Sequence, residues 1–282
     1  MKKILFACAI CFVCLAQINA KGKKELTILH TNDTHSCIFP LSKNLADTML
    51  AGRGGFIRRI AMLKEERTKN PDLLYFDSGD FSQGSTYYSM YKGDVEIGLM
   101  NMMGIDASTI GNHEFDFGID NMARIFKMAK FPILCSNYDF TGTPLMGLVK
   151  PYIIIKRKGI KIGVFALNPK MEGLVLRDNY SDVKFIDPSK VANEMVTILK
   201  KEKKCDVVIC ISHLGWTKNV YSDQNVFSKT RGVDLVLGGH SHTYFETLHY
   251  IKDLDGKEIP VDQNGKNGIF IGKLTLNFEK KK

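Results

Sequence analysis

The stretch IDASTIGNHEFDFG (105–118) holds the most specific pattern in this chain of 282 residues. A short run, Asp106–Ile110, is followed at once by GNHE (111–114). Glycine allows a tight turn, and polar side chains directly after a strand are typical of a binding site at the carboxyl end of a strand in an α/β sheet. The stretch therefore predicts an α/β domain with a polar site where a strand ends.

Apolar runs of strand length recur on both sides of this stretch. They are Leu26–Leu29, Leu73–Phe76, Ile133–Cys135, Ile153–Ile155, Ile162–Leu167, Val207–Ile211 and Val233–Leu237. Continuous apolar runs of this length predict strands that are buried on both faces. An alternating pattern over 268–278 predicts one more strand.

Helical patterns lie between the runs. A first helix ends at Asn70-Pro71, a second ends at Gly104, and a third begins at Asp187-Pro188. The residues predicted to face inward are Phe56, Ile57, Ile60 and Leu63 in the first, Val95, Leu99 and Met102 or Met103 in the second, and Val191, Met195 and Ile198 in the third. Alternating strands and helices predict an α/β domain in which helices cover the sheet faces.

Composition and charge narrow the class of protein. Hydrophobic residues make up 44% and charged residues 24%, which excludes a disordered tail, a collagen-like fibre and a coiled-coil rod. Lysine and arginine total 39 against 30 acids, a net charge of +9. The lysines gather at the chain ends and at one helix end, without a nucleic-acid-binding motif, so we expect a solvated surface and no nucleic-acid partner.

Residues 1–20 have the pattern of a secretory signal peptide. A basic start, Met1–Lys3, precedes an apolar run, Ile4–Ile18, and Ala20 offers a small residue at the expected cleavage point. The run is short for a membrane span, so we expect a secreted or periplasmic protein, residues 21–282, without a transmembrane segment. Lipid anchoring is not expected, because the usual lead-in precedes none of Cys8, Cys11 and Cys14.

The four remaining cysteines are Cys37, Cys135, Cys205 and Cys210. Their spacing indicates neither a disulfide framework nor a zinc site, although an exported protein permits disulfides. Buried free thiols are the favoured interpretation.

Polar clusters follow five of the predicted strands. Their metal-ligating or catalytic candidates are Asp33, His35, Asp80, Asn112, His113, Asp116, His213, His240 and His242. The carboxyl ends of strands can bring such clusters to one place. Imidazole and carboxylate together suit Zn, Mn or Fe, whereas an all-oxygen set would suit Mg or Ca. One Asp-x-His pair is usually a solvated turn, but the ordered combination predicts a divalent-metal site.

The ordered set resembles the calcineurin-like metallophosphoesterases, and among them the catalytic domain of the exported 5′-nucleotidase family, which includes UDP-sugar hydrolases and 2′,3′-cyclic-nucleotide phosphodiesterases. The similar stretches are ILHTNDTHS (28–36), GGFIRRIAML (54–63), LLYFDSGDFSQGS (73–85), MNMMGIDASTIGNHEFDFG (100–118), FPILCSNY (131–138), CISHLG (210–215), LGGHSHT (237–243) and the tail 259–278. The resemblance implies a four-layer αββα sandwich of two mixed β-sheets flanked by helices.

The resemblance also implies roles for the candidates. One divalent ion would be held by Asp33, His35, Asp80 and His242, and a second by Asp80, Asn112, His213 and His240. His113 would be the catalytic histidine and Asp116 the acid that orients it, while Asn112 and His113 would contact the substrate phosphate. His30 and His249 are expected to be structural, and Arg53 and Arg58 to lie on a solvated helix face.

These expectations describe an exported two-metal phosphoesterase that acts on nucleotides through a hydroxide shared by the ions. Alternatives are a 2′,3′-cyclic-nucleotide phosphodiesterase, a broad phosphomonoesterase, or a metal-binding subunit that needs a partner. Family members usually carry a second, C-terminal domain that binds the nucleoside. The resemblance therefore implies that a separate chain supplies this domain or that the enzyme is less selective.

Overall fold

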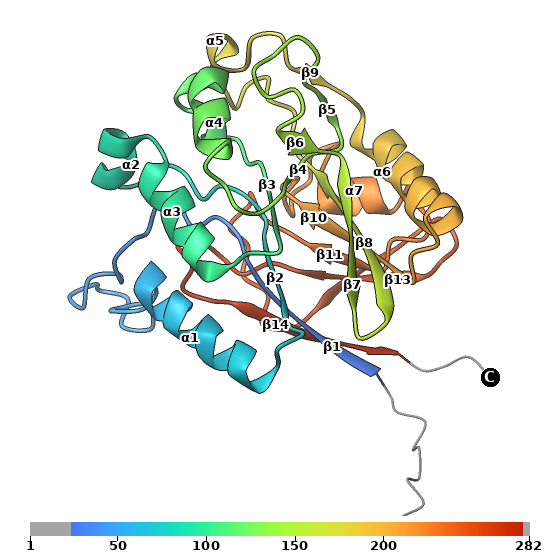
Figure 1. Ribbon diagram of the computed structural model, residues 1–282, viewed down its shortest axis with the longest axis horizontal. Coiled ribbons are helices and arrows are strands. Elements are labelled where there is room, and N and C mark those ends of the chain that lie inside the picture. Colours follow the sequence, from blue (N-terminus) through green and yellow to red (C-terminus); the bar gives the residue numbers. More distant parts are fainter. Residues whose placement is uncertain (1–23, 279–282) are drawn as a thin grey trace, which may run out of the picture.

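The computed structural model describes residues 24–278 (Figure 1). The expected signal peptide, residues 1–20, lies outside the described residues. Within 24–278, no helix has the length and apolar character that crossing a membrane requires.

The first sheet has six strands in the order β14-β1-β2-β3-β4-β6. Its strands are β1 (Lys24–Thr31), β2 (Leu74–Asp77), β3 (Ala107–Thr109), β4 (Ile133–Leu134), β6 (Val149–Lys150) and β14 (Gly272–Phe278). All neighbours are parallel except β14, which runs antiparallel to β1 and pairs Phe278 with Lys24. The carboxyl ends of β1, β2 and β3 therefore meet at one edge of the sheet.

The second sheet also has six strands, in the order β12-β13-β11-β10-β8-β7. Its strands are β7 (Tyr152–Arg157), β8 (Ile160–Leu167), β10 (Val207–Ser212), β11 (Leu235–Leu237), β12 (His249–Lys252) and β13 (Glu258–Asp262). The central strands β8, β10, β11 and β13 are parallel, and the edge strands are antiparallel. A two-stranded sheet joins β5 (Tyr138–Asp139) to β9 (Lys184–Phe185).

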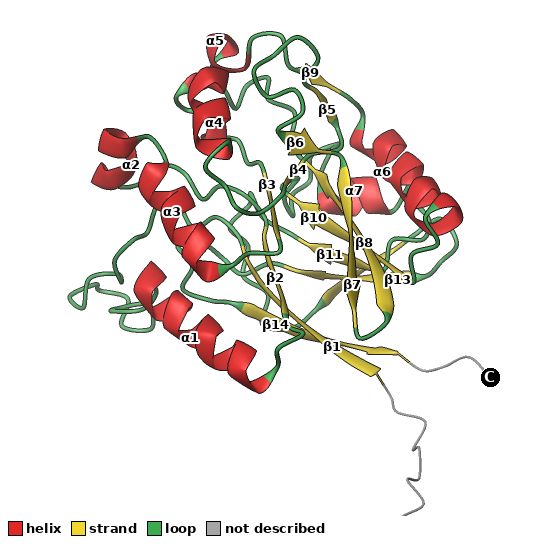
Figure 2. Cartoon of the chain, viewed as in Figure 1, coloured by secondary structure: helices red, strands yellow, loops and turns green. Residues whose placement is uncertain are grey.

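Helices flank the two sheets on opposite sides (Figures 1 and 2). They are α1 (Phe56–Lys69), α2 (Thr86–Tyr91), α3 (Asp94–Met103), α4 (Gly118–Phe126), α5 (Arg177–Tyr180), α6 (Pro188–Val196) and α7 (Asp223–Phe227), with a 3₁₀ turn η1 (His113–Phe115) and a π-helical end of α6, η2 (Thr197–Glu202). Helix α1 ends at Lys69, with Asn70 as its C-cap residue, which agrees with the end predicted at Asn70-Pro71.

Three apolar clusters fill the spaces between these layers. Leu26 and Ile28 of β1 pack with Ile209 and Ile211 of β10 between the two sheets. Leu29 of β1 points the other way, into the cluster with α1, α3 and α4, and a third cluster lies between the second sheet and α6. Alternate side chains of one strand thus enter different layers. The predicted αββα sandwich is confirmed.

Two predicted helix faces were partly wrong. In α1, Ile57 is exposed and Arg59 is buried, with its guanidinium 3.9 Å from the centre of the Phe56 ring. The inward positions of a helix are three and four residues apart, so Phe56 shares its face with Arg59 and not with Ile57. In α3, the buried apolar residues are Ile97, Met100 and Met103.

The two histidines expected to be structural lie outside the donor cluster, and of these His30 is buried and His249 is exposed. His30 is fully buried in β1, where its Nε2 lies 2.8 Å from Asp262 Oδ2. His249 stacks on the Phe245 ring, with 4.0 Å between the ring centres. Arg53 and Arg58 are both exposed, but only Arg58 lies on a helix, because α1 begins at Phe56. The four cysteines within the described residues are free thiols, of which Cys37 is half-buried and the others are buried.

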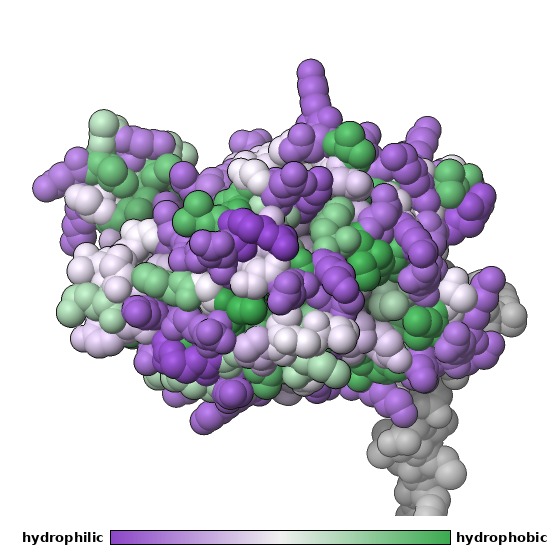
Figure 3. Space-filling model, turned by 90° about the horizontal axis from the view of Figure 1, so that it is seen from above, coloured by the Kyte–Doolittle hydropathy of each residue, from purple (hydrophilic) through white to green (hydrophobic). Residues whose placement is uncertain are grey.

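The surface is mixed in character. From above, hydrophilic side chains cover much of the face, and hydrophobic areas lie scattered among them (Figure 3).

Candidate metal centre

Five strand ends, three from the first sheet and two from the second, converge at one edge of the sandwich. Asp33 and His35 follow β1, Asp80 follows β2, Asn112 and His113 follow β3, His213 follows β10, and His240 and His242 follow β11. Ligand atoms lie within 4.8 Å of one another in each of three groups: Asp33-His35-His242, His35-Asp80-His113 and Asp80-His213-His240. The fold thus brings the predicted residues together, and Asp80 belongs to two of the groups.

The backbone at this edge adopts an uncommon conformation. The candidates with left-handed φ are Asp33 (49°), His35 (42°), Asp80 (52°), His240 (72°) and His242 (55°). Non-glycine residues in this region cost about 1–3 kcal/mol each, and such strain gathers at functional sites. Loop contacts hold it in place, because Asp33 N donates to Gly79 O and His35 N to Asp80 O, each at 2.9 Å.

The Asp33 carboxylate is oriented by its neighbours. Asn32 Nδ2 donates to Asp33 Oδ2 at 2.6 Å, and the His240 amide donates to the same oxygen at 2.9 Å. Asn32 is fixed in turn, because its Oδ1 accepts from Asn264 N at 2.9 Å. Burial raises the pKa of Asp33 to about 7, and a nearby cation would favour its ionised form. Asn32 is a positioning residue that was given no role from the sequence.

His35 and His240 have the neutral form that metal ligation requires. Burial disfavours the charged imidazole of His213, but the charge and hydrogen bond of Asp80 outweigh it and raise its pKa to about 10, so a bound cation would have to displace that proton. His213 Nδ1 lies 2.6 Å from Ser78 O and His35 Nδ1 lies 3.3 Å from Ser82 O. Donation from Nδ1 leaves each Nε2 to face the cluster, where His35 Nε2 lies 2.8 Å from His242 Nε2 and His213 Nε2 lies 3.1 Å from Asp80 Oδ2. Burial lowers the pKa of both His35 and His240 to about 4, so both are neutral at neutral pH.

Three buried polar atoms indicate that the cluster can hold a cation. Asn112 Oδ1, His213 Nε2 and His240 Nδ1 have no hydrogen-bond partner, although Asp80 Oδ2 lies 3.1 Å from His213 Nε2. An unpaired buried polar group costs about 1–3 kcal/mol, and a cation would satisfy all three. A donor set of imidazole, carboxylate and amide oxygen fits a divalent ion such as Zn, Mn or Fe.

His113 is paired with Asp116 next to this cluster. Its Nδ1 lies 3.1 Å from Asp116 Oδ2, and its ring centre lies 5.4 Å from that of His35. Burial disfavours the charged imidazole, but the Asp116 hydrogen bond and the Asp80 charge outweigh it, so the pKa of His113 lies above its usual value. This geometry suits a group that donates a proton near neutral pH.

Glu114 braces the loops that carry the candidates, a role the sequence did not reveal. Its Oε2 accepts from the amides of Asp80 (3.0 Å) and Gly111 (2.5 Å), and its Oε1 accepts from Ser82 N at 3.0 Å. The side chain is fully buried. The available signal was its place in the GNHE stretch, an acid between a turn and a buried phenylalanine.

Replacing Glu114 with glutamine should therefore weaken the fold and the centre together. A glutamine amide nitrogen cannot accept a hydrogen bond, so at least one buried amide would lose its partner. We expect the free energy of unfolding to fall by about 1–3 kcal/mol and metal affinity to fall about 10–100-fold. Urea titration and metal-binding titration measure the two effects. Glu65→Gln, at an exposed position of α1, is the control. If both variants have the same free energy of unfolding and the same metal affinity, Glu114 does not hold the loops in place.

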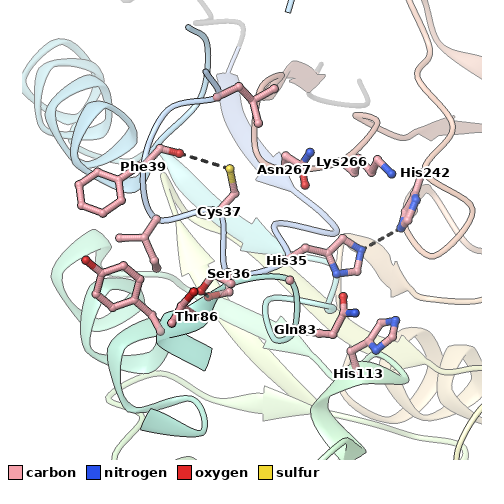
Figure 4. A pocket seen from close by; sticks show the side chains of 15 residues that line it. His35, Ser36, Cys37, Phe39, Gln83, Thr86, His113, His242, Lys266 and Asn267 are labelled. Carbon is pink, nitrogen blue, oxygen red and sulfur yellow. Dashed lines mark hydrogen bonds between the residues drawn. The ribbon is translucent and has the colours of Figure 1, made fainter. Parts of the chain in front are cut away.

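A pocket of about 590 Å³ opens beside the cluster. His35, His113 and His242 line one side of it, and Phe39 lies across from them (Figure 4). The volume lies within the range of small-molecule sites.

The sandwich with this donor cluster at the ends of both sheets is typical of metallophosphoesterases. The profile of the calcineurin-like phosphoesterase family matches residues 26–244. The chain belongs to this family, whose members are metal-dependent hydrolases.

Individual relatives support the same placement. A snake venom 5′-nucleotidase from Gloydius brevicauda is 32% identical, over 95% of this chain and 48% of that protein. The 5′-nucleotidase of Homo sapiens is 31% identical, over 93% of this chain and 48% of its own length. The crystal structure of a 5′-nucleotidase precursor from Thermus thermophilus matches with a TM-score of 0.80 at 28% identity, over 91% of this chain and 52% of that one. The chain thus spans about half the length of the curated relatives it matches.

Proposed function

We propose that this protein hydrolyses phosphate esters of nucleotides with the help of two divalent metal ions. The observation that carries the proposal is the central place of Asp80, which forms one donor group with His35 and His113 and another with His213 and His240, beside an open pocket. Similarity to 5′-nucleotidases supports nucleotides as the substrate class.

The proposed ligands divide into two overlapping sets. Asp33, His35, Asp80 and His242 would hold one ion, and Asp80, Asn112, His213 and His240 the other. When bound, two such ions supply Lewis acidity toward the phosphate and lower the pKa of a bound water. The Asn112 amide can donate to a phosphate oxygen, and protonated His113, held by Asp116, can donate to the leaving oxygen.

The His113–Asp116 pair predicts a pH effect. Because the pKa of His113 is raised, its protonated form persists to higher pH, and activity should fall as pH rises through this pKa. Asp116→Asn removes the charge that supports the imidazolium, so the alkaline limb of the pH profile of kcat should move to lower pH. Asp120→Asn, an exposed residue of α4, should leave the limb in place. An unmoved limb in Asp116→Asn would exclude His113 as the titrating group.

Phosphate release from a substrate panel tests the function. The protein, supplied with Mn or Zn, would be assayed with nucleoside monophosphates, UDP-glucose, 2′,3′-cyclic nucleotides and a chromogenic ester. Preference for nucleoside monophosphates supports the proposal, whereas preference for cyclic nucleotides identifies a phosphodiesterase. Indifference to the base identifies a broad phosphomonoesterase. Metal binding without hydrolysis of any ester would identify a metal-binding subunit.

We also propose export, based on the basic start and apolar run within residues 1–20. N-terminal sequencing of the protein from its native host should find a chain that begins near Lys21, and an intact Met1 would contradict export by this route.

A further inference from the structure

Two aromatic rings line the pocket beside the candidate metal centre. The Phe39 and Tyr87 ring centres lie 5.9 Å apart, and the side chains are 64% and 37% exposed. Tyr91 stacks on Tyr87, with 6.5 Å between ring centres. In Figure 4 Phe39 lies across the pocket from His35 and His242. A molecule held at the histidines would extend toward this aromatic wall, which we define as Phe39 and Tyr87.

The position of Tyr87 is fixed relative to the centre. The Ser36 hydroxyl, one residue after His35, bonds to the Ser85 hydroxyl and donates to Glu96 of α3. Ser85 also caps α2, the helix that carries Tyr87, by accepting from Tyr88 N at 3.3 Å. One hydrogen-bond network therefore connects the His35 loop to the wall.

The backbone around Phe39 is also anchored. Ile38 O accepts from Phe56 N at 3.0 Å, and Leu41 N donates to Arg53 O at 2.8 Å. Gly55 packs so closely on Pro40 that a Cβ at Gly55 would lie 2.9 Å from the proline ring. Because the loop that carries Phe39 is anchored, its ring loses little conformational entropy when a ligand stacks on it.

A lysine side chain lies near the histidine side of the pocket. Lys266 lines the pocket, lies beside His242 in Figure 4, and makes no ion pair or side-chain hydrogen bond within residues 24–278. The next residue, Asn267, anchors this loop by donating its amide to Asp33 O at 2.7 Å. An unpaired ammonium beside metal donors suits an anionic group, whereas the wall suits a flat apolar ring.

We propose that Phe39 and Tyr87 form the leaving-group subsite and stack the base of a nucleoside monophosphate, so that this chain itself distinguishes nucleotides from aliphatic phosphate esters. Lys266 acts on the phosphate, which both kinds of ester share. The inference rests on the proposed function and adds to it the residues that select the substrate.

Leucine substitutions test the wall because they keep apolar bulk and remove the ring. In Phe39→Leu and in Tyr87→Leu, kcat/KM for adenosine 5′-monophosphate should fall on the order of tenfold, the scale of base–aromatic stacking. The value for glycerol 2-phosphate should stay unchanged. Tyr250→Leu, at a 55% exposed tyrosine of β12 outside this pocket, should change neither. In Lys266→Gln, kcat/KM should fall by a similar factor for both esters.

If the ratio of kcat/KM for the two esters is the same in both leucine variants as in the unsubstituted protein, Phe39 and Tyr87 do not form the leaving-group subsite. Binding of adenosine to the metal-free protein gives a separate readout, since adenosine has no phosphate and needs no hydrolysis. Equilibrium dialysis should detect this binding and find it weakened in Phe39→Leu, and equal binding would also overturn the subsite. If the unsubstituted protein releases phosphate from neither ester, the proposed function fails, while the dialysis still tests the wall.

Discussion

Replacing Asp80 with asparagine is expected to remove both metal ions and nearly all activity. Asp80 belongs to two donor groups, and its carboxylate lies 3.1 Å from His213 Nε2. Loss of the shared negative charge weakens both proposed metal sets together. Metal catalysis is worth several kcal/mol, so turnover should fall about a thousandfold or more.

Asparagine is the appropriate substitution for this test. It tolerates the left-handed backbone of Asp80 (φ 52°) and keeps an oxygen that can accept from His113 N, which lies 2.9 Å from Asp80 Oδ1. Metal content by elemental analysis should fall from two ions per chain toward none, with the circular dichroism spectrum unchanged. Asp120→Asn removes one exposed charge and should keep both ions. A variant of Asp80 that retains two ions would rule out the shared-ligand role.

Replacing His113 with alanine is expected to lower turnover by two to four orders of magnitude, roughly the contribution of a positioned general acid. The metal content should stay intact, because the proposed ligand sets do not include His113. Its Nδ1 is held by Asp116, so the proton that it donates comes from the other ring nitrogen.

The leaving group separates this role from a structural one. An alkoxide needs a proton as it departs, whereas nitrophenolate does not, so the loss should be large with a nucleoside monophosphate and small with p-nitrophenyl phosphate. Equal losses on both esters, or loss of metal from the variant, would contradict the general-acid assignment. His249→Ala, a histidine outside the cluster, should behave like the unsubstituted protein.

The sequence predicted the central strands and the candidate residues well, because both depend on local patterns. Strand-length apolar runs such as Val207–Ile211 are buried on both faces, and the polar cluster after each run needs only the rule that parallel strands end together. The short strand β6, the edge strand β12 and its neighbour β13 were not predicted. The sequences of these three strands lack continuous apolar runs, so only pairing with a neighbour defines them.

Contacts between distant segments were also beyond prediction. Nothing local to Glu114 indicates that it accepts hydrogen bonds from the loop that carries Asp80, more than 30 positions away. Arg59 has the sequence context of a solvated helix face, yet its helix packs it over Phe56. Phe39 and Tyr87 lie in separate segments, and only the fold places them on one wall.

The antiparallel pairing of β1 with β14 sets the order of events in the making of this protein. The first described strand gains its outer neighbour only when the last has been synthesised, and His242 follows His35 by 207 positions. At translation rates of about 5–20 residues per second, the early ligands wait for at least about ten seconds for the later ones. A metal ion held by residues of both the β1 and β11 loops can therefore bind only after the later part of the chain has been made.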